Sequence, residues 1–394
     1  MTMRGDNRRW MKCILLAGLA AGLVFPAGAG AQADKAADEP KPLNIPWGPF
    51  LQNLTPTGVN VVWCVADRKD DVLEYGSSAD KLDKSVVPGA DAAGRAAIPG
   101  LEPGKTYFYR VRMKSADSSQ TAWSDAASFT TPAADVTKFC FAVIADTHTS
   151  GCNKDLAALM KELKPDFVLN GGDRSPSIVS GTLKPYKDIM AGVPMYMARG
   201  NHDSADKQSM VSMMPGPGDN QYFAFTWGNA RFICVNTEDR KGPNGALKKG
   251  GVQYQWLEEE LKSCKQPWKI VFQHIPVYSA YDGGLTDDLD DERELLEKYG
   301  VDVVFQGHQH NYDRSHPLKD KAVAKDGKGV IYITASGACG GKEKFPKGTD
   351  FPFLAKTYNG GPFLGMVYVD GNKAKVECVA PDKKVIDSFE LKKP

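Results

Sequence analysis

Apolar and polar positions follow two different rhythms along the chain. Between residues 47 and 132 they alternate with a period of two, as at Val59, Val61 and Trp63 and again over residues 107–113. No helical spacing intervenes, and a Leu-Glu-Pro-Gly turn at 101–104 precedes the second run. We therefore predict that residues 47–132 form an all-β sandwich of short strands.

From residue 133 onward, short apolar runs alternate with stretches of helical spacing. Strands are predicted at residues 139–145, 167–170, 195–198, 231–236, 270–272, 301–305 and 330–334. Helices are predicted from Leu156 to Leu163, with Asn153 as the N-cap, and over 253–262 and 291–299. Asp370-Gly371-Asn372 between two apolar runs predicts a hairpin. This alternation predicts that residues 133–394 form an α/β domain, with β-sheets flanked by helices.

The first 46 residues have the composition of a leader rather than of a fold. Basic residues precede an apolar stretch at 13–25, and Ala29-Gly30-Ala31 has the form of a cleavage site. We predict a signal peptide over residues 1–31 and a disordered leader over 32–46, which is rich in Ala, Asp, Lys and Pro. The expected destination is the periplasm or the exterior. No stretch is long enough for a membrane span.

The overall composition is that of an ordinary globular protein, with 42% hydrophobic and 25% charged residues. The formal net charge of +1 predicts no nucleic-acid-binding surface, so an anionic substrate must be attracted by a local site. Seven cysteines follow the predicted cleavage site, and none forms a Cys-x-x-Cys pair, which disfavours a zinc-thiolate site. Neither the disulfide pairing nor the oligomeric state can be read from these patterns.

Five short polar signatures directly follow apolar runs of the second region, and they contain five of the six histidines. The signatures are Asp146-Thr147-His148, Gly171-Gly172-Asp173, Gly200-Asn201-His202-Asp203, Gln273-His274 and Gly307-His308-Gln309-His310. Side chains at the carboxyl ends of neighbouring strands converge on one crevice. Imidazoles, carboxylates and an amide oxygen that meet there are the ingredients of a metal site.

The number of donors indicates two ions rather than one. The candidate ligands are Asp146, His148, Asp173, Asn201, His274, His308 and His310. Seven are too many for one tetrahedral zinc but suit two ions about 3.5–4 Å apart that share Asp173. Mixed oxygen and nitrogen donors fit iron, zinc or manganese better than magnesium or calcium. One buried His alone is more often a core group, but five signatures, each behind a predicted strand, favour metal.

The order of these signatures resembles that of the calcineurin-like metallophosphoesterases, over residues 135–394. Within that superfamily the chain is similar to purple acid phosphatases, because of the run Gly307 to Arg314 and the leading domain. That leading domain resembles fibronectin type III domains through Trp63 and the Leu-x-Pro-Gly-x-Thr-Tyr sequence at 101–107. It contains no His and no clustered acids, so we interpret it as a scaffold or as a wall beside the substrate.

The resemblance implies a role for each signature. It implies a first metal held by Asp146, His148, Asp173 and His310, and a second held by Asp173, Asn201, His274 and His308. It also implies that His202 is the general acid or a donor to phosphate oxygen, and that Asp203 orients it. Further weak candidates are Arg174 and Arg199 for phosphate, Tyr278 and Tyr281 for the pocket wall, His316 as a loop residue, and the segments 204–219 and 337–365 as substrate loops.

The chain departs from the purple enzymes at one ligand. They have Asp-x-Gly where this chain has Asp146-Thr147-His148, and they place a tyrosine ligand three residues beyond the shared Asp, where this chain has Pro176. We therefore expect His148 to replace the tyrosinate, and we expect no strong tyrosinate-to-iron absorption band.

The combined prediction is an exported phosphomonoesterase that uses a metal-activated hydroxide on a small phosphorylated substrate. A phosphodiesterase or nucleotide hydrolase on the same metals is an alternative. A further alternative is a binding or adhesion protein with an inactive metal domain.

Overall fold

The computed structural model describes residues 47–64, 68–89, 94–115, 121–148, 150–174, 182, 184–203, 221–241, 245–280, 284–338 and 351–394. The predicted signal peptide (1–31) and leader (32–46) lie outside the described residues. Across the described ranges, no helix combines the length and apolarity that a membrane crossing needs. All described residues belong to one compact unit.

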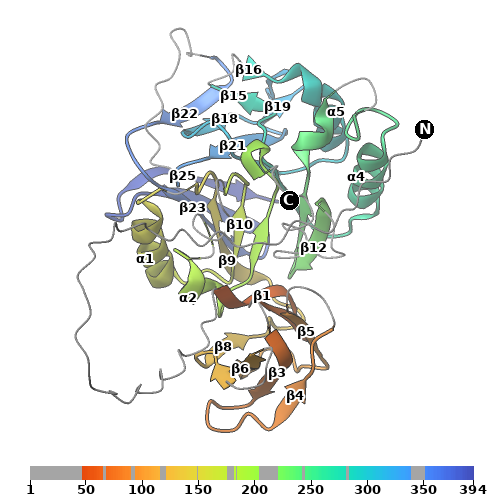
Figure 1. Cartoon of the computed structure of the whole chain (residues 1–394). Helices are drawn as coiled ribbons and strands as arrows, with labels where there is room; N and C mark the ends of the chain where they lie inside the picture. The colour runs from red at the N-terminus through yellow and green to blue at the C-terminus, as the bar shows by residue number, and fades with distance from the viewer. Residues whose placement is uncertain are drawn as a thin grey trace, which may run out of the picture. The chain divides into compact units, whose positions relative to one another are not determined.

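The first region is a β-sandwich of antiparallel strands (Figure 1, red to orange). One sheet consists of β1 (Trp47–Thr55), β2 (Gly58–Cys64) and β5 (Gly94–Pro99). The other consists of β4 (Lys84–Val86), β3 (Arg68–Gly76), β6 (Thr106–Ser115) and β7 (Thr121–Trp123), with β8 (Ala127–Thr130) also paired to β6. Tyr109, Val111 and Met113 are buried on alternate positions, as the period of two predicts. Trp63 is buried and donates its indole N–H to Asp71 at 2.8 Å.

Two larger sheets form the second region (Figure 1). The six-stranded sheet has the order β11 (Met195–Met197), β10 (Phe167–Asn170), β9 (Lys138–Ile144), β23 (Leu364–Asp370), β24 (Lys373–Val379) and β25 (Val385–Lys392). The seven-stranded sheet has the order β12 (Phe223–Trp227), β13 (Ala230–Cys234), β14 (Trp268–Phe272), β17 (Val303–Gln306), β21 (Ile331–Ala335), β18 (Tyr312–Ser315) and β22 (Leu354–Tyr358). Two small hairpins pair β15 (Tyr278–Ser279) with β16 (Gly284–Leu285), and β19 (Leu318–Lys319) with β20 (Ala322–Val323).

The strand directions decide where the polar signatures meet. Strands β9, β10 and β11 are parallel neighbours in one sheet, and β13, β14, β17 and β21 are parallel neighbours in the other. Strands β23, β24 and β25 extend the first sheet in antiparallel fashion, and the predicted hairpin turn lies between β23 and β24. Parallel strands place their carboxyl ends along the same edge of a sheet.

Helices cover the outer face of each sheet. Helices α1 (Asn153–Leu163) and α2 (Lys187–Met190) pack on the six-stranded sheet, and α4 (Val252–Ser263) and α5 (Asp290–Lys298) pack on the seven-stranded one. The short 3-10 helices are η2 (Asn201–Asp203), η4 (Thr237–Arg240) and η5 (Asp287–Leu289). The predicted N-cap Asn153 was wrong: Cys152 occupies the cap, and the Asn153 amide instead donates to Thr147 O at 2.7 Å.

The inner faces of the two sheets meet in an aromatic core. Along β9, Phe141 and Val143 join this core, whereas the alternate residues Ala142 and Ile144 face the helices. Phe141 stacks on Phe167 of β10 with ring centroids 5.0 Å apart. A strand that is buried on both faces has no side that faces solvent, and its sequence is therefore a continuous apolar run.

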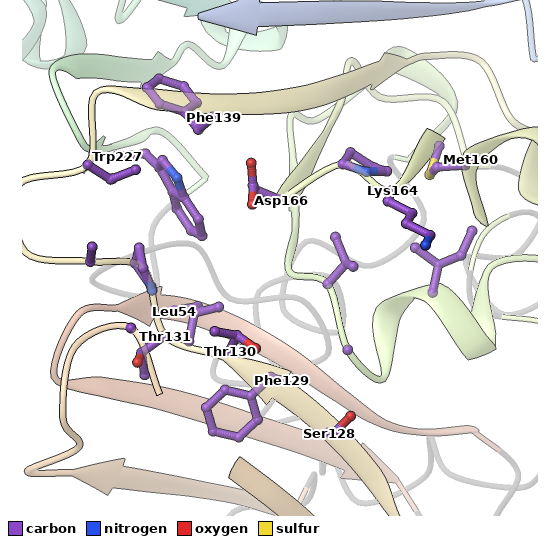
Figure 2. A pocket seen from close by; sticks show the side chains of 18 of the residues that line it. Leu54, Ser128, Phe129, Thr130, Thr131, Phe139, Met160, Lys164, Asp166 and Trp227 are labelled. Carbon is purple, nitrogen blue, oxygen red and sulfur yellow. The ribbon is translucent and has the colours of Figure 1, made fainter. Parts of the chain in front are cut away.

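The sandwich joins the second region at the amino end of β11 and in the loop before it. Gln52 donates to Met195 O at 3.0 Å, and the Tyr109 hydroxyl donates to Ala191 O at 2.7 Å. Figure 2 shows a cleft at this junction, with Phe129 on the sandwich side and with Trp227 and Asp166 on the other. The cleft lies at the opposite ends of the strands from the polar signatures, so it is separate from the predicted chemistry.

Candidate metal centre

The polar signatures begin where the parallel strands end. Asp146 and His148 follow β9, and Asp173 follows β10. Asn201 opens η2, which comes after β11. His274 follows β14, and both His308 and His310 follow β17. Three of these strands belong to one sheet and two to the other, so the site is built at the shared carboxyl edge of both.

One group of ligands, the buried half-site, consists of Asp173, His274 and His308 together with Asn201. The ligand atoms of Asp173, His274 and His308 lie within 4.8 Å of one another. His274 is fully buried, and its Nε2 lies 3.3 Å from Asp173 Oδ2 and 3.0 Å from Asn201 Oδ1. Its Nδ1 faces Gly171 O at 2.8 Å, which requires a proton on Nδ1 and leaves Nε2 as the ligand atom.

The other group, the open half-site, consists of Asp146, His148 and His310. Its ligand atoms also lie within 4.8 Å of one another. The Nε2 atoms of His148 and His310 are 3.3 Å apart, and His310 Nε2 is 3.6 Å from Asp146 Oδ1. The His148 and His310 side chains are 22% and 28% exposed, so this half-site faces solvent.

Asp173 lies between the two half-sites. Its Oδ2 is 3.3 Å from His274 Nε2 and 3.9 Å from His148 Nε2, so one carboxylate oxygen faces a ligand of each group. Its Oδ1 accepts a hydrogen bond from His202 N at 2.9 Å. This placement is what a carboxylate shared between two cations requires.

Five candidate ligands have a left-handed backbone. They are Asp146 (φ 57°), His148 (φ 38°), Asp173 (φ 56°), His308 (φ 76°) and His310 (φ 51°). Non-glycine residues rarely adopt positive φ, and such residues concentrate at functional sites. The tight turns let successive side chains after one strand point to the same crevice. The strand-then-polar pattern predicts the residues but not this conformation.

Glycines allow the ligand loops to approach one another closely. Gly172 has a φ of +98°, so the turn before Asp173 requires it. Gly307 has no positive φ, but a Cβ there would lie 2.9 Å from His274 Nδ1 and 3.0 Å from Asp146 Oδ2. Gly307 is therefore required by space rather than by turn geometry.

In the metal-free site, buried carboxylates and imidazoles form pairs of opposite charge. Burial alone would raise the pKa of Asp173, but the bonds and charges of His274 and His202 hold it well below its usual range. Burial alone would lower the pKa of His274, but its bond to Asp173 and the charge of Asp146 raise it to about 9. A cation bound here would replace the proton as the counter-charge of these carboxylates.

An independent observation supports a cation beside Asp146. Asp146 Oδ1 is buried and accepts no hydrogen bond from the described residues, whereas Asp146 Oδ2 accepts one from His308 N at 2.9 Å. A buried carboxylate oxygen without a donor is costly unless a cation lies beside it. The oxygen and imidazole donors match zinc, iron or manganese.

His202 and Asp203 take different positions in η2. The His202 side chain is 59% exposed, and its Nε2 lies 4.0 Å from Asp173 Oδ2 at the solvent side of the site. Among the described residues, the hydrogen-bond and ion-pair partners of the Asp203 carboxylate do not include the His202 ring. The carboxylate accepts from Gly200 N at 2.9 Å and Asp173 N at 3.1 Å, and it pairs with Arg174 Nη2 at 2.7 Å. Asp203 thus fixes the loop that carries Asp173.

Four of the weaker candidates, Arg174, Arg199, Tyr278 and His316, lie among the described residues. Arg174 is buried against Asp203, and Arg199 donates to Gln221 at 3.2 Å. Tyr278 is buried in the core against Tyr332 and Phe353. His316 is exposed. Positions outside the described residues are Pro176, Tyr281, 204–219 and, within the 337–365 segment, 339–350.

Sequence reasoning missed Ser336, which lies in the loop after β21. Its hydroxyl donates to Asp146 Oδ2 and accepts from His310 N at 2.9 Å. The signal was the same as for the ligands: a small polar residue directly after the apolar run at 330–335, followed by Gly337.

Comparison with known proteins assigns the same two regions. Residues 140–312 match the calcineurin-like phosphoesterase family, and residues 50–131 match the purple acid phosphatase N-terminal domain. The chain therefore contains a calcineurin-like phosphoesterase domain, behind a β-sandwich that matches the N-terminal domain of purple acid phosphatases, and in both regions it is similar to metal-dependent phosphoester hydrolases.

Individual relatives are purple acid phosphatases and acid phosphatases. The chain is 27% identical to purple acid phosphatase 23 of Arabidopsis thaliana over 60% of each chain, and 24% identical to acid phosphatase type 7 of Danio rerio over 90% of this chain and 91% of that one. A purple acid phosphatase structure from yellow lupin (Lupinus luteus) seeds superposes with a TM-score of 0.72 at 18% identity, covering 87% of this chain and 74% of that one. The lupin structure supports the fold alone.

Proposed function

We propose that the chain is an exported phosphomonoesterase with a dinuclear metal centre. The observation that carries this proposal is the position of Asp173, whose Oδ2 faces both His274 and His148. In the proposed arrangement, the open half-site holds the first cation and the buried half-site holds the second, with Asp173 as a ligand to both.

Two bound cations would lower the pKa of a water molecule and neutralise charge on the phosphoryl oxygens. The remaining chemistry comes from the chain. His202, exposed and 4.0 Å from Asp173 Oδ2, has the reach to donate a proton to a leaving alkoxide at the solvent side. Arg174 and Asp203 keep the Asp173 loop in place, and His202 N fixes Asp173 Oδ1 so that Oδ2 is turned to the half-sites.

The test is elemental analysis of the purified protein, coupled to a substrate panel of a monoester, a diester and nucleotides. We expect two equivalents of zinc, iron or manganese and fastest turnover on the monoester. Fastest turnover on the diester or a nucleotide would establish the alternative hydrolase. Metal-loaded protein that hydrolyses no phosphoester would favour the binding or adhesion role.

The first cation site is proposed to lack a tyrosinate ligand. His148 lies 3.3 Å from His310 Nε2, at the place where the resemblance puts the first metal. We expect the iron-loaded protein to show no strong tyrosinate band in its visible spectrum. A purple colour that survives dialysis would contradict this assignment.

Export is proposed from the sequence of residues 1–31. Mass spectrometry of the protein recovered from the periplasm or medium should show a chain that begins at Gln32. An intact chain confined to the cytoplasm would contradict this part of the proposal.

A further inference from the structure

We propose that Ser336 is a positioning residue that restricts Asp146 to one metal-binding oxygen and couples it to His310. The inference rests on the proposed dinuclear centre and concerns its open half-site. Ser336 is fully buried and lies on neither of the strands that carry these two ligands.

The two carboxylate oxygens of Asp146 have different surroundings. Oδ2 accepts hydrogen bonds from the Ser336 hydroxyl and from His308 N, and Oδ1 accepts none from the described residues. Two donors on Oδ2 hold the plane of the carboxylate in one orientation. Oδ1 is thereby turned toward His310 Nε2, 3.6 Å away. Asp146 is thus prepared to bind a cation through Oδ1 alone.

Ser336 also holds the second ligand of the same half-site. Its oxygen accepts from His310 N at 2.9 Å, at a residue whose φ of 51° is unfavourable without support. One hydroxyl thus accepts a hydrogen bond from the His310 backbone N–H and donates one to Asp146 Oδ2. This chain of hydrogen bonds fixes both ligands relative to each other.

The surrounding sheet keeps Ser336 in place. Ala335, the last residue of β21, pairs with Tyr312 of β18, and Ser336 N donates to Asn311 O at 3.2 Å. Gly337 packs against the Phe363 ring so closely that a Cβ would lie 2.5 Å from it. The hydroxyl is therefore presented from a rigid strand end, which suits a group that orients a ligand.

The test is the Ser336→Ala variant, with Ser315→Ala as the matched control. Ser315 is also buried beside β21 and accepts from Tyr332 N at 2.9 Å, but it contacts no candidate ligand. Metal affinity is measured by chelator competition with zinc, and ligand geometry by the visible spectrum of the cobalt(II)-substituted protein. Wild-type metal content is measured alongside.

We expect Ser336→Ala to bind one zinc with about 10–100-fold weaker affinity and to change the cobalt spectrum, the usual effect of removing an outer-shell partner. Ser315→Ala should keep both zinc affinities and the cobalt spectrum. Unchanged zinc affinities and an unchanged spectrum in Ser336→Ala would overturn the inference while leaving the dinuclear centre intact. Wild-type protein that binds no metal would overturn the dinuclear centre itself.

A second variant covers the case in which Ser336→Ala does not fold. Ser336→Cys keeps most of the volume but replaces the hydroxyl with a weaker donor. Its affinity for the more weakly bound zinc should be lower than that of the wild type. A wild-type affinity in a folded Ser336→Cys variant would also count against the role of the hydroxyl.

Discussion

The two half-sites of the candidate metal centre are built in opposite ways. In the buried half-site, His274 is fully buried and both its ring nitrogens face oxygen partners, Gly171 O and Asn201 Oδ1. In the open half-site, His148 and His310 are partly exposed and their Nε2 atoms face each other at 3.3 Å. One side is preset by hydrogen bonds, and the other is accessible to water and substrate.

The difference indicates separate roles for the two half-sites. A preset, buried ligand needs little reorganisation when a cation binds, so the buried half-site is suited to retain its metal. An exposed half-site admits a phosphoryl group, and the His202 ring stands beside it, 5.5 Å from the His148 ring. Asp173 is the only one of the seven proposed ligands assigned to both half-sites. A substitution at Asp173 should therefore disturb both half-sites at once.

The largest effect is expected from Asp173→Asn, which removes the shared charge. Two cations held close together repel each other, and an amide cannot offset that repulsion as a carboxylate does. We expect loss of at least one metal and a fall in kcat/KM on the order of 10⁴-fold. Elemental analysis and monoester kinetics check this. A variant that keeps two metals and near-normal turnover would remove Asp173 from the shared position.

A smaller loss is expected from His202→Ala, because His202 belongs to neither half-site as a ligand. Both metals should stay bound, and turnover should fall about 10²–10⁴-fold on substrates with poor leaving groups. Substrates with good leaving groups, which need no proton, should lose much less. Elemental analysis with two monoesters of different leaving-group pKa measures this. Loss of a metal in this variant would instead make His202 a ligand of the open half-site.

Much of the candidate site could be predicted from the sequence, because an apolar run followed by polar residues marks the end of a strand. The two periodicities also predicted the β-sandwich and the α/β class, and the structure confirmed both. Ser336 follows an apolar run as the ligands do, but its contacts with Asp146 and His310 depend on β21 lying beside β17, a long-range pairing that local patterns do not encode. The Asp203 contacts were also out of reach, since a carboxylate beside a His in sequence need not touch its ring.

A pH effect should distinguish the half-sites further. In the metal-free protein the pKa of His274 is raised to about 9 by its bond to Asp173, so His274 carries a proton throughout the neutral range. Binding a cation at the buried half-site must release that proton. Its apparent affinity should therefore fall about tenfold for each pH unit below 9.

Calorimetry in buffers of different ionisation enthalpy measures this proton release directly. Wild-type protein should release at least one proton per cation at the buried half-site at pH 7. The His148→Ala variant, which keeps the buried half-site, should release it too. Cation binding to that variant without proton release, with an affinity that is flat between pH 6 and 8, would contradict the raised pKa of His274.

The smallest effect concerns a buried acid on α5, Glu292. Glu292 of α5 is fully buried next to Gln273, the residue before His274, and burial raises its pKa to about 8, only partly opposed by the Gln273 side chain. The folded protein therefore keeps a proton that the unfolded chain releases above about pH 4.5. By linkage, this group makes the free energy of unfolding fall as the pH rises from about 4.5 to about 8.

The isosteric Glu292→Gln variant removes that titration. We expect its stability relative to the wild type to improve steadily between pH 4.5 and 8, reaching several degrees in Tm at pH 8, because each kcal/mol shifts Tm by about 2–4 °C in a domain of this size. Thermal unfolding of metal-free protein across this range measures the difference. Exposed Glu294, on the same helix, supplies the matched control Glu294→Gln, whose Tm difference should not grow with pH. Parallel pH profiles for the wild type and Glu292→Gln would show that Glu292 is ionised in the fold. The carboxyl group beside Gln273 would then be negatively charged rather than neutral.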